Sequence, residues 1–181
     1  SSDEAFQLAQ QLEEKNLQRQ RLTEEFLMRA KAELSIAAGS WPLLMIGGED
    51  YPSGIAGLIA GKLSEEFYRP SFVYEIRDNV ARGSARSIPE FDVVSALAQC
   101  KDLLQRFGGH PGAAGFSLSE ENVVTLQQRL LDIAAQQLSG IDLRPHLTID
   151  AAVSLSDIRG KTFRLVERFA PFGHRNPMPI F

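Results

Sequence analysis

The residues best suited to chemistry lie in one ten-residue segment, 107–116, which contains four glycines, two alanines and one histidine. Glycine lacks a Cβ and tolerates positive φ, so a ligand can approach the backbone of such a segment closely. Successive N–H groups in turns of this kind form a concavity that suits an anion. His110 adds a hydrogen-bond donor, or a positive charge when it is protonated. The alternative is a tight turn that enters a buried strand and carries a core histidine.

A second polar cluster lies in 82–87, within a predicted strand. Alternation along a strand places Ser84 and Arg86 on one face and Ser87 on the other. A guanidinium can bind two phosphate oxygens, and a serine hydroxyl can donate one more hydrogen bond. The alternative is a solvent-exposed edge strand. Because both clusters fall in one predicted domain, we expect them to face each other and to grip one phosphate backbone.

Other kinds of catalytic site find little support in the sequence. The histidines at 110, 146 and 174 are far apart, and no acid cluster has the spacing of metal ligands. Glu49 and Asp50 form an isolated acidic pair, which we expect in a solvated loop. The chain has neither a Walker-type loop nor a convincing Ser–His–Asp arrangement. We therefore expect it to hold a substrate rather than to cleave one.

Composition indicates a soluble globular chain of 181 residues, 44% hydrophobic and 23% charged. The net charge is −4, yet 155–181 carries five basic and two acidic residues, a local balance of +3. The single cysteine, Cys100, leaves no disulfide within the chain, which favours the cytoplasm. Its apolar helical surroundings predict a core position. No apolar run reaches the ~18 residues that a membrane span requires, so we expect no membrane partner.

The elements that position these clusters alternate between helix and strand, which predicts an α/β sandwich. Apolar periodicity and turn residues predict five helices and five strands. The helices are expected over 3–35, 55–68, 92–107, 119–138 and around 163–169, and the strands over 41–46, 71–76, 80–88, 116–118 and 147–150. Asp92 is the expected N-cap of its helix. The first and last residues, Ser1 and Phe181, suggest a piece of a longer protein.

The glycine-rich and serine–arginine segments together resemble the DHHA1 domain of the DHH phosphoesterase superfamily. The residues that carry the resemblance are Gly108-Gly109-His110, Ala113-Ala114-Gly115 and Gly83-Ser84-Ala85-Arg86-Ser87. Within the superfamily, the chain is most similar to the RecJ family of bacterial single-strand-specific exonucleases. That similarity rests on Asn16-x-x-Arg19-Gln20, on 51–57 and 67–70, and on the proline-rich ending 171–181. RecJ chains often have Trp where Tyr51 stands.

The resemblance implies a fold and a domain organisation. The fold would be a DHHA1-type sandwich, with a central mixed sheet flanked by helices and a long inter-domain helix in front. Residues 1–38 would form that linker helix, and 39–140 the DHHA1 substrate-binding domain. Residues 141–181 would begin the connection to an oligonucleotide-binding barrel, and their positive charge would continue the DNA path.

The resemblance also implies a function. Members of the RecJ family remove nucleotides from the 5′ end of single-stranded DNA during repair and recombination. The family's Mn²⁺ or Mg²⁺ ions would bind a DHH domain whose motifs this chain lacks, so the chain alone is expected to hold no cofactor and to be inactive. Its implied partners are the 5′ end of single-stranded DNA, its own DHH domain and its oligonucleotide-binding domain. The predicted substrate-binding residues are Ser84, Arg86, Ser87, Gly108, Gly109 and His110. Tyr51 and Phe116 are candidates for base stacking, with core or turn positions as the alternative.

Two other functions stay open at this point. The chain could be the DHHA1 domain of a phosphodiesterase for small nucleotides or oligoribonucleotides, since the Gly-Gly-His segment is shared with those proteins. It could also be a non-enzymatic module, either the domain of an alanyl-tRNA-synthetase-like protein or a pure interaction domain. The long leading helix and the proline-rich ending favour the exonuclease.

Overall fold

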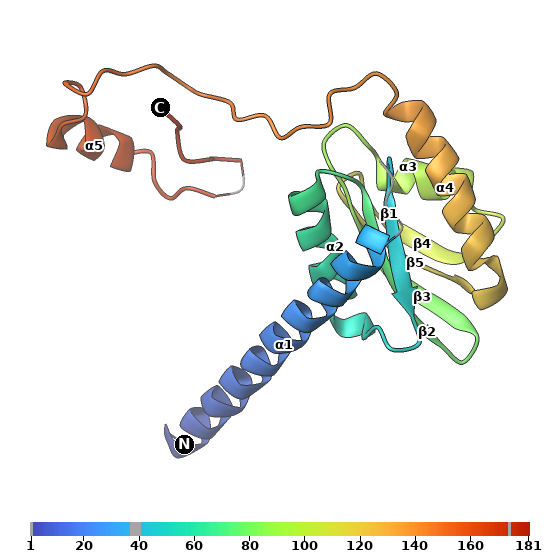
Figure 1. The fold of residues 1–181 in the computed structure, drawn as a ribbon. Coiled ribbons are helices and arrows are strands. Elements are labelled where there is room, and N and C mark those ends of the chain that lie inside the picture. The colour runs from blue at the N-terminus through green and yellow to red at the C-terminus, as the bar shows by residue number, and fades with distance from the viewer. Residues whose placement is uncertain (1, 37–40, 174) are drawn as a thin grey trace. The chain divides into compact units, whose positions relative to one another are not determined.

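The computed structural model describes residues 2–36, 41–173 and 175–181. The chain divides into two compact units, one up to Leu143 and the other from Arg144 onward. His174 and the domain boundary expected at 38/39 lie outside the described residues. The elements, shown in Figure 1, are α1 (Ser2–Ile36), β1 (Leu44–Gly48), α2 (Ser53–Phe67), β2 (Ser71–Arg77), β3 (Val80–Arg86), α3 (Val93–Gln99), β4 (Leu104–His110), β5 (Ala113–Ser119), the 3₁₀ turn η1 (Glu120–Asn122), α4 (Val123–Gln137) and α5 (Gly160–Glu167).

The first unit is a five-stranded sheet in the order β1-β2-β3-β5-β4, with helices on both faces. β1 runs parallel to β2 and the other pairs are antiparallel. The predicted fold class, a mixed sheet flanked by helices and preceded by a long helix, is confirmed. We name the two sides of the sheet by the helices that cover them. The α2 face includes Leu44, Ile46 and Val73, and the α4 face includes Met45 and Phe72.

Small residues allow α2 to pack closely on the sheet. Its buried side is formed by Ile55, Ala56, Ile59, Ala60 and Leu63, which recur at helical spacing. The helix lies over β2 and β3. α3 and α4 cover the opposite face, where Cys100 is fully buried as the sequence predicts. This burial raises the pKa of the Cys100 thiol.

The helix predicted over 92–107 is much shorter in the structure. It ends at Gln99, and 104–110 instead forms β4, an edge strand paired with β5. Leu103 and Leu104 do pack against the core as expected, but from a turn and a strand. The segment expected as a glycine-rich loop is therefore the β4–β5 hairpin, turning at Pro111 and Gly112. Pairing with β5 overrode the helical spacing of the leucines.

The second unit contains α5, and the strand predicted over 147–150 does not form there. The Asp150 N–H donates to the Ile180 carbonyl at 2.8 Å, and the Ile180 N–H donates to Asp150 Oδ2 at 2.9 Å. In the second bond the acceptor is the Asp150 carboxylate and not a backbone carbonyl, so the two segments do not form the backbone ladder of paired strands. Phe169, expected in the final helix, lies just beyond the end of α5. None of the described helices is long and apolar enough to cross a membrane.

Asp92 caps α3 as predicted. Its Oδ1 accepts hydrogen bonds from the N–H groups of Val94 at 2.9 Å and Ser95 at 3.0 Å. Backbone and side-chain hydrogen bonds from Ser95, with a smaller contribution from Val94, lower the pKa of Asp92 below its ordinary value of 3.8. The ionised form is therefore favoured in the folded state.

Asp92→Ala should lower the free energy of unfolding at neutral pH by about 1 kcal/mol, the usual worth of an N-cap. Because the folded pKa is depressed, the ionic part of this stabilisation is present above pH 3.8 and is lost as the pH falls through the folded value. Urea unfolding at neutral and acid pH measures the difference. Asp92→Asn keeps a capping oxygen without a charge, and should retain most of the stability at both pH values. An equal Asp92→Ala deficit at both would contradict the ionic contribution.

Candidate functional site

Strand pairing aligns three rows of residues across the α2 face, because directly opposed residues on neighbouring strands share a face. From β1 to β4, the first row is Leu44, Ser71, Arg86, Ala113 and His110. The second row is Ile46, Val73, Ser84, Gly115 and Gly108. The third row is Gly48, Glu75, Arg82, Ser117 and Arg106.

These rows divide the α2 face into two halves of different chemistry. The half on β1 and β2 is largely apolar and is packed against α1 and α2. The half on β3, β5 and β4, which we term the open half, carries arginine, serine, histidine and glycine. Arg82, Arg106, Gly108, Gly115 and His110 are exposed there. Exposure of Gly115 on an interior strand means that no described helix covers β5 and β4 on this side, whereas α2 reaches over β3.

The two predicted clusters meet on one sheet instead of facing each other. The glycine-rich segment is a strand, joined to β3 through β5, so the clusters lie side by side. Four of the six predicted site residues then share the open half: Ser84, Arg86, Gly108 and His110. The expectation that the two clusters face each other is wrong, because it treated the glycine-rich segment as a loop and not as a strand.

The other two predicted residues lie elsewhere. Gly109 is paired with Ala114, which is buried on the α4 face. Its φ is 152°, and a Cβ there would come within 2.2 Å of the Ala113 carbonyl oxygen, so the hairpin itself requires glycine. The Ser87 hydroxyl donates to the Phe91 carbonyl at 2.6 Å, which ties down the turn after β3. Both residues shape the backbone next to the open half.

Gly108 has a different reason to be glycine. A Cβ at this position would meet no atom within 4 Å, so packing does not exclude a side chain. Because Gly108 has no side chain, the surface is recessed between Ser84 and His110, and a ligand can reach the backbone there. Tyr51 and Phe116, the candidates for base stacking, are 1% and 5% exposed and belong to the core.

A cleft of about 550 Å³ opens between α1, α2 and the C-terminal end of β3. Arg86 reaches it from the sheet, and Arg19 and Gln20 reach it from α1. The other lining residues are Thr23, Glu24, Gly57, Leu58, Gly61, Lys62 and Glu65. Arg19 was noted in the sequence only as part of a family motif, and the structure adds it to the candidate site.

Two arginines are positioned at this cleft by local contacts. Arg86 Nη1 donates to the Ala85 carbonyl at 2.8 Å, which uses one of the five N–H donors of the guanidinium. Arg19 Nη2 donates to Asn16 Oδ1 at 2.7 Å, one turn earlier on α1. A Cβ on Gly57 would lie 3.0 Å from Arg86 Nη2 and 3.5 Å from Ser84 Oγ. Glycine at 57 therefore leaves room for both polar groups beneath α2.

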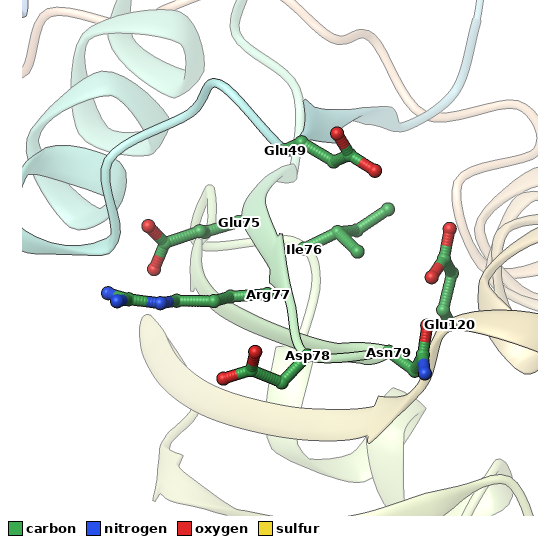
Figure 2. Close-up of a pocket in the computed structure, with 7 residues that line it drawn as sticks. All are labelled: Glu49, Glu75, Ile76, Arg77, Asp78, Asn79 and Glu120. Carbon is green, nitrogen blue, oxygen red and sulfur yellow. The ribbon is translucent and has the colours of Figure 1, made fainter.

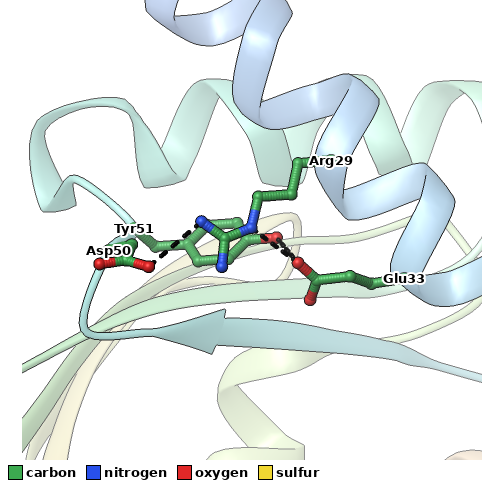
Figure 3. Close-up of polar contacts among 4 residues, drawn as sticks. All are labelled: Arg29, Glu33, Asp50 and Tyr51. Atoms are coloured by element: carbon green, nitrogen blue, oxygen red, sulfur yellow. Dashed lines mark hydrogen bonds and ion pairs between the residues drawn. The ribbon is translucent and has the colours of Figure 1, made fainter.

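The position of Arg19 depends on how α1 is held. Leu27 and Ala30 are buried against the rest of the first unit, while most of α1 before Leu22 is exposed. The Phe26 and Tyr51 rings meet edge to face at 5.3 Å, and the Arg29 guanidinium lies 5.2 Å from the Tyr51 ring centre. Arg29 also donates to Glu33 at 2.8 Å, as Figure 3 shows.

Charge and burial reinforce this docking network. Arg29 Nη1 lies 3.4 Å from Asp50 Oδ2, which links α1 to the loop before α2. Burial, followed by the charge of Glu33, raises the pKa of Tyr51 to about 12. Tyr51 is thus a neutral, buried anchor between α1 and the sheet. The acidic pair of the β1–α2 loop contributes Asp50 to this network instead of forming a site of its own.

An acidic surface marks the end of the sheet at the β2–β3 turn. Figure 2 shows Glu75, Arg77 and Asp78 at the end of β2, with Glu49 above them in the view and Glu120 to the right. Within 2–36, 41–173 and 175–181, no group of three or more His, Cys, Asp or Glu side chains could hold a metal ion. The described residues therefore do not fit a metal centre.

Comparison with known proteins agrees with this architecture. The model of the DHHA1 domain family matches residues 35–138. The single-stranded-DNA-specific exonuclease RecJ of Bacillus subtilis is 33% identical over 180 residues, which are 98% of this chain and 23% of the relative. The crystal structure of RecJ in complex with Mn²⁺ from Thermus thermophilus superposes with a TM-score of 0.81 at 28% identity. That match covers 94% of this chain and 25% of the solved one.

The chain belongs to the DHHA1 domain family. Because its similarity to RecJ extends through α1 and through the second unit as well, the domain is of the RecJ type. The chain spans about a quarter of the length of the curated relatives it matches. A second crystal structure of RecJ from Thermus thermophilus, in complex with Mg²⁺, matches with a TM-score of 0.79.

Proposed function

We propose that this chain is the part of a RecJ-type exonuclease that holds the 5′ end of single-stranded DNA. The observation that carries the proposal is the convergence of Arg19, Ser84 and Arg86 near one cleft. Two guanidinium groups and a hydroxyl make a suitable pocket for a terminal phosphate. Gly108 and His110 continue the same face toward the rest of the strand.

The proposal assigns catalysis to another part of a longer protein. Relatives about four times as long have room for a DHH domain and an oligonucleotide-binding domain, which would be the partners of this domain. Any Mn²⁺ or Mg²⁺ chemistry would take place in the DHH domain, with this domain closing over it. We further propose that the whole protein acts in cytoplasmic DNA repair and recombination.

Binding measurements test the proposal directly. A 12-base single strand with a 5′-phosphate should bind in a salt-dependent way, with log K falling by about 0.7 per log unit of salt for each phosphate contact. The same strand with a 5′-hydroxyl, and a duplex of equal length, should bind more weakly. Equal affinity for all three ligands would contradict recognition of a single-stranded 5′ end. Preference for a mononucleotide over the strand would instead favour a small-nucleotide phosphodiesterase.

Gly57→Ala should weaken binding of the 5′-phosphorylated strand about fivefold, equivalent to about 1 kcal/mol or one hydrogen bond. The added methyl group would crowd the Arg86 guanidinium, while alanine slightly favours the helix. Gly61→Ala is the matched control, because its Cβ would lie at an ordinary 3.9 Å from Arg86 Cγ. Fluorescence anisotropy and thermal unfolding of both variants distinguish a local effect from loss of stability. Equal affinities of the two variants would contradict the role of Gly57.

A further inference from the structure

We infer that a second phosphate-binding site lies in the third row of the open half, formed by Arg82, Ser117 and Arg106. The inference rests on the proposed function and extends it. The ligand is the phosphodiester backbone of the strand whose 5′ end occupies the cleft. Ser117 and Arg106 lie outside the motifs that singled out the candidate site in the sequence, and Arg82 begins the 82–87 cluster without a role assigned to it there.

Register alone brings the three residues together. Ser117 on β5 is paired with Arg82 on β3 and with Arg106 on β4. Opposed Cβ atoms on neighbouring strands lie about 5 Å apart, so two like charges flank one hydroxyl. Arg106 follows the regular register of the β4–β5 hairpin, and the bulge between Leu104 and Arg106 shifts only the residues before it. Both arginines are exposed and Ser117 is half-buried.

The charge of the surrounding face favours an anion. On the α2 face, the described rows of β3, β5 and β4 contain Arg82, Arg86, Arg106 and His110 but no acid. Glu75, the member of the third row on β2, is an acid paired with Arg82 and lies outside the open half. Arg82 and Arg106 lie two strands apart, about 10 Å at the usual strand spacing, so both positive charges act on the space above Ser117. A phosphodiester would satisfy both.

The acidic end of the sheet sets the direction in which the strand would leave. Arg86 and Arg82 are four residues apart on β3, about 13 Å at the usual rise of a strand. Beside Arg82 the strand would meet Glu75, and beyond it Asp78 and Glu120, all of which repel phosphate. We therefore expect the strand to run from the cleft across Gly115 toward Arg106 and to leave over the β4 edge.

A double variant, Arg82→Gln with Arg106→Gln, tests the inference. Affinity for the 12-base 5′-phosphorylated strand should fall about tenfold at low salt, and the salt slope should fall by about 1.4, twice the value for one phosphate. A 5′-phosphorylated dinucleotide, which reaches only the cleft, should bind as it does to the unchanged protein. Both side chains are exposed, so thermal unfolding should change little. Ser117→Asp, which removes no arginine, should also weaken the 12-base strand.

The matched control removes two positive charges from the other side of the sheet. It combines Lys101→Gln, after α3, with Arg129→Gln on α4, whose exposed ion pair with Asp102 contributes little. If the double variant has the same salt slope and strand affinity as this control, the inference is overturned. If Arg86→Gln also has no effect, or the unchanged protein does not bind the strand, the proposed function fails too.

Discussion

Replacing Arg19 and Arg86 together by glutamine should lower the affinity for 5′-phosphorylated single-stranded DNA at least about a hundredfold. Each hydrogen bond from a guanidinium to a charged group contributes about 1.5–3 kcal/mol, and the two arginines line one cleft. Most of the advantage of the 5′-phosphate over a 5′-hydroxyl should disappear as well. Anisotropy titrations with the two strands measure both effects.

Three further variants show whether the loss of affinity comes from the two guanidinium groups. Arg86→Lys keeps the charge but loses the planar fork, so its affinity should lie between those of the unchanged protein and Arg86→Gln. Asn16→Ala removes the acceptor that positions Arg19 and should have a smaller effect than loss of Arg19 itself. The charge-matched control, Lys101→Gln with Arg129→Gln, should bind nearly as well as the unchanged protein. A double variant that still prefers the 5′-phosphate would place the terminal phosphate outside this cleft.

Tyr51→Ala should lower the free energy of unfolding by about 3–5 kcal/mol, as expected when a large buried ring is truncated. The ring is 1% exposed and packs against Phe26. Its loss should also loosen α1, and with it Arg19, so DNA affinity should fall although Tyr51 does not line the cleft. Urea unfolding measures the stability, and hydrogen exchange along α1 measures the loosening.

Tyr51→Phe separates the ring from its hydroxyl. The hydroxyl lies 3.5 Å from Glu33 Oε1, a long contact, so this variant should stay within about 1 kcal/mol of the unchanged protein. Its affinity for DNA should also be retained. If Tyr51→Phe were as unstable as Tyr51→Ala, the polar network and not ring packing would be what holds α1.

Local signals in the sequence predicted much of the first unit. Asp92 is a cap because its carboxylate suits exposed N–H groups, and the small residues of α2 indicate close packing on a sheet. Alternation along β3 correctly placed Ser84 and Arg86 on one face. Each of these features depends on neighbours within a few residues, which is why periodicity and residue type sufficed.

Features that depend on distant pairing could not be predicted in the same way. Leu103 and Leu104 fit a helical pattern, and only pairing of 104–110 with β5 makes that segment a strand. The row of Arg82, Ser117 and Arg106 arises from the strand order β3-β5-β4, which is not encoded locally. The contact between Asn16 and Arg19 is a local signal, because residues three apart meet on one turn of a helix, so the sequence came closer to indicating a role for Arg19.

The most direct test of the account is a paired measurement on one sample of the protein. A 5′-labelled single strand with a 5′-phosphate is titrated to measure binding, and the same mixture is then incubated with Mn²⁺ to measure cleavage. We predict salt-dependent binding without cleavage, because this domain holds the strand end and the chemistry takes place in another domain. Cleavage that follows the protein through purification, or no binding of the strand at all, would contradict the proposed function.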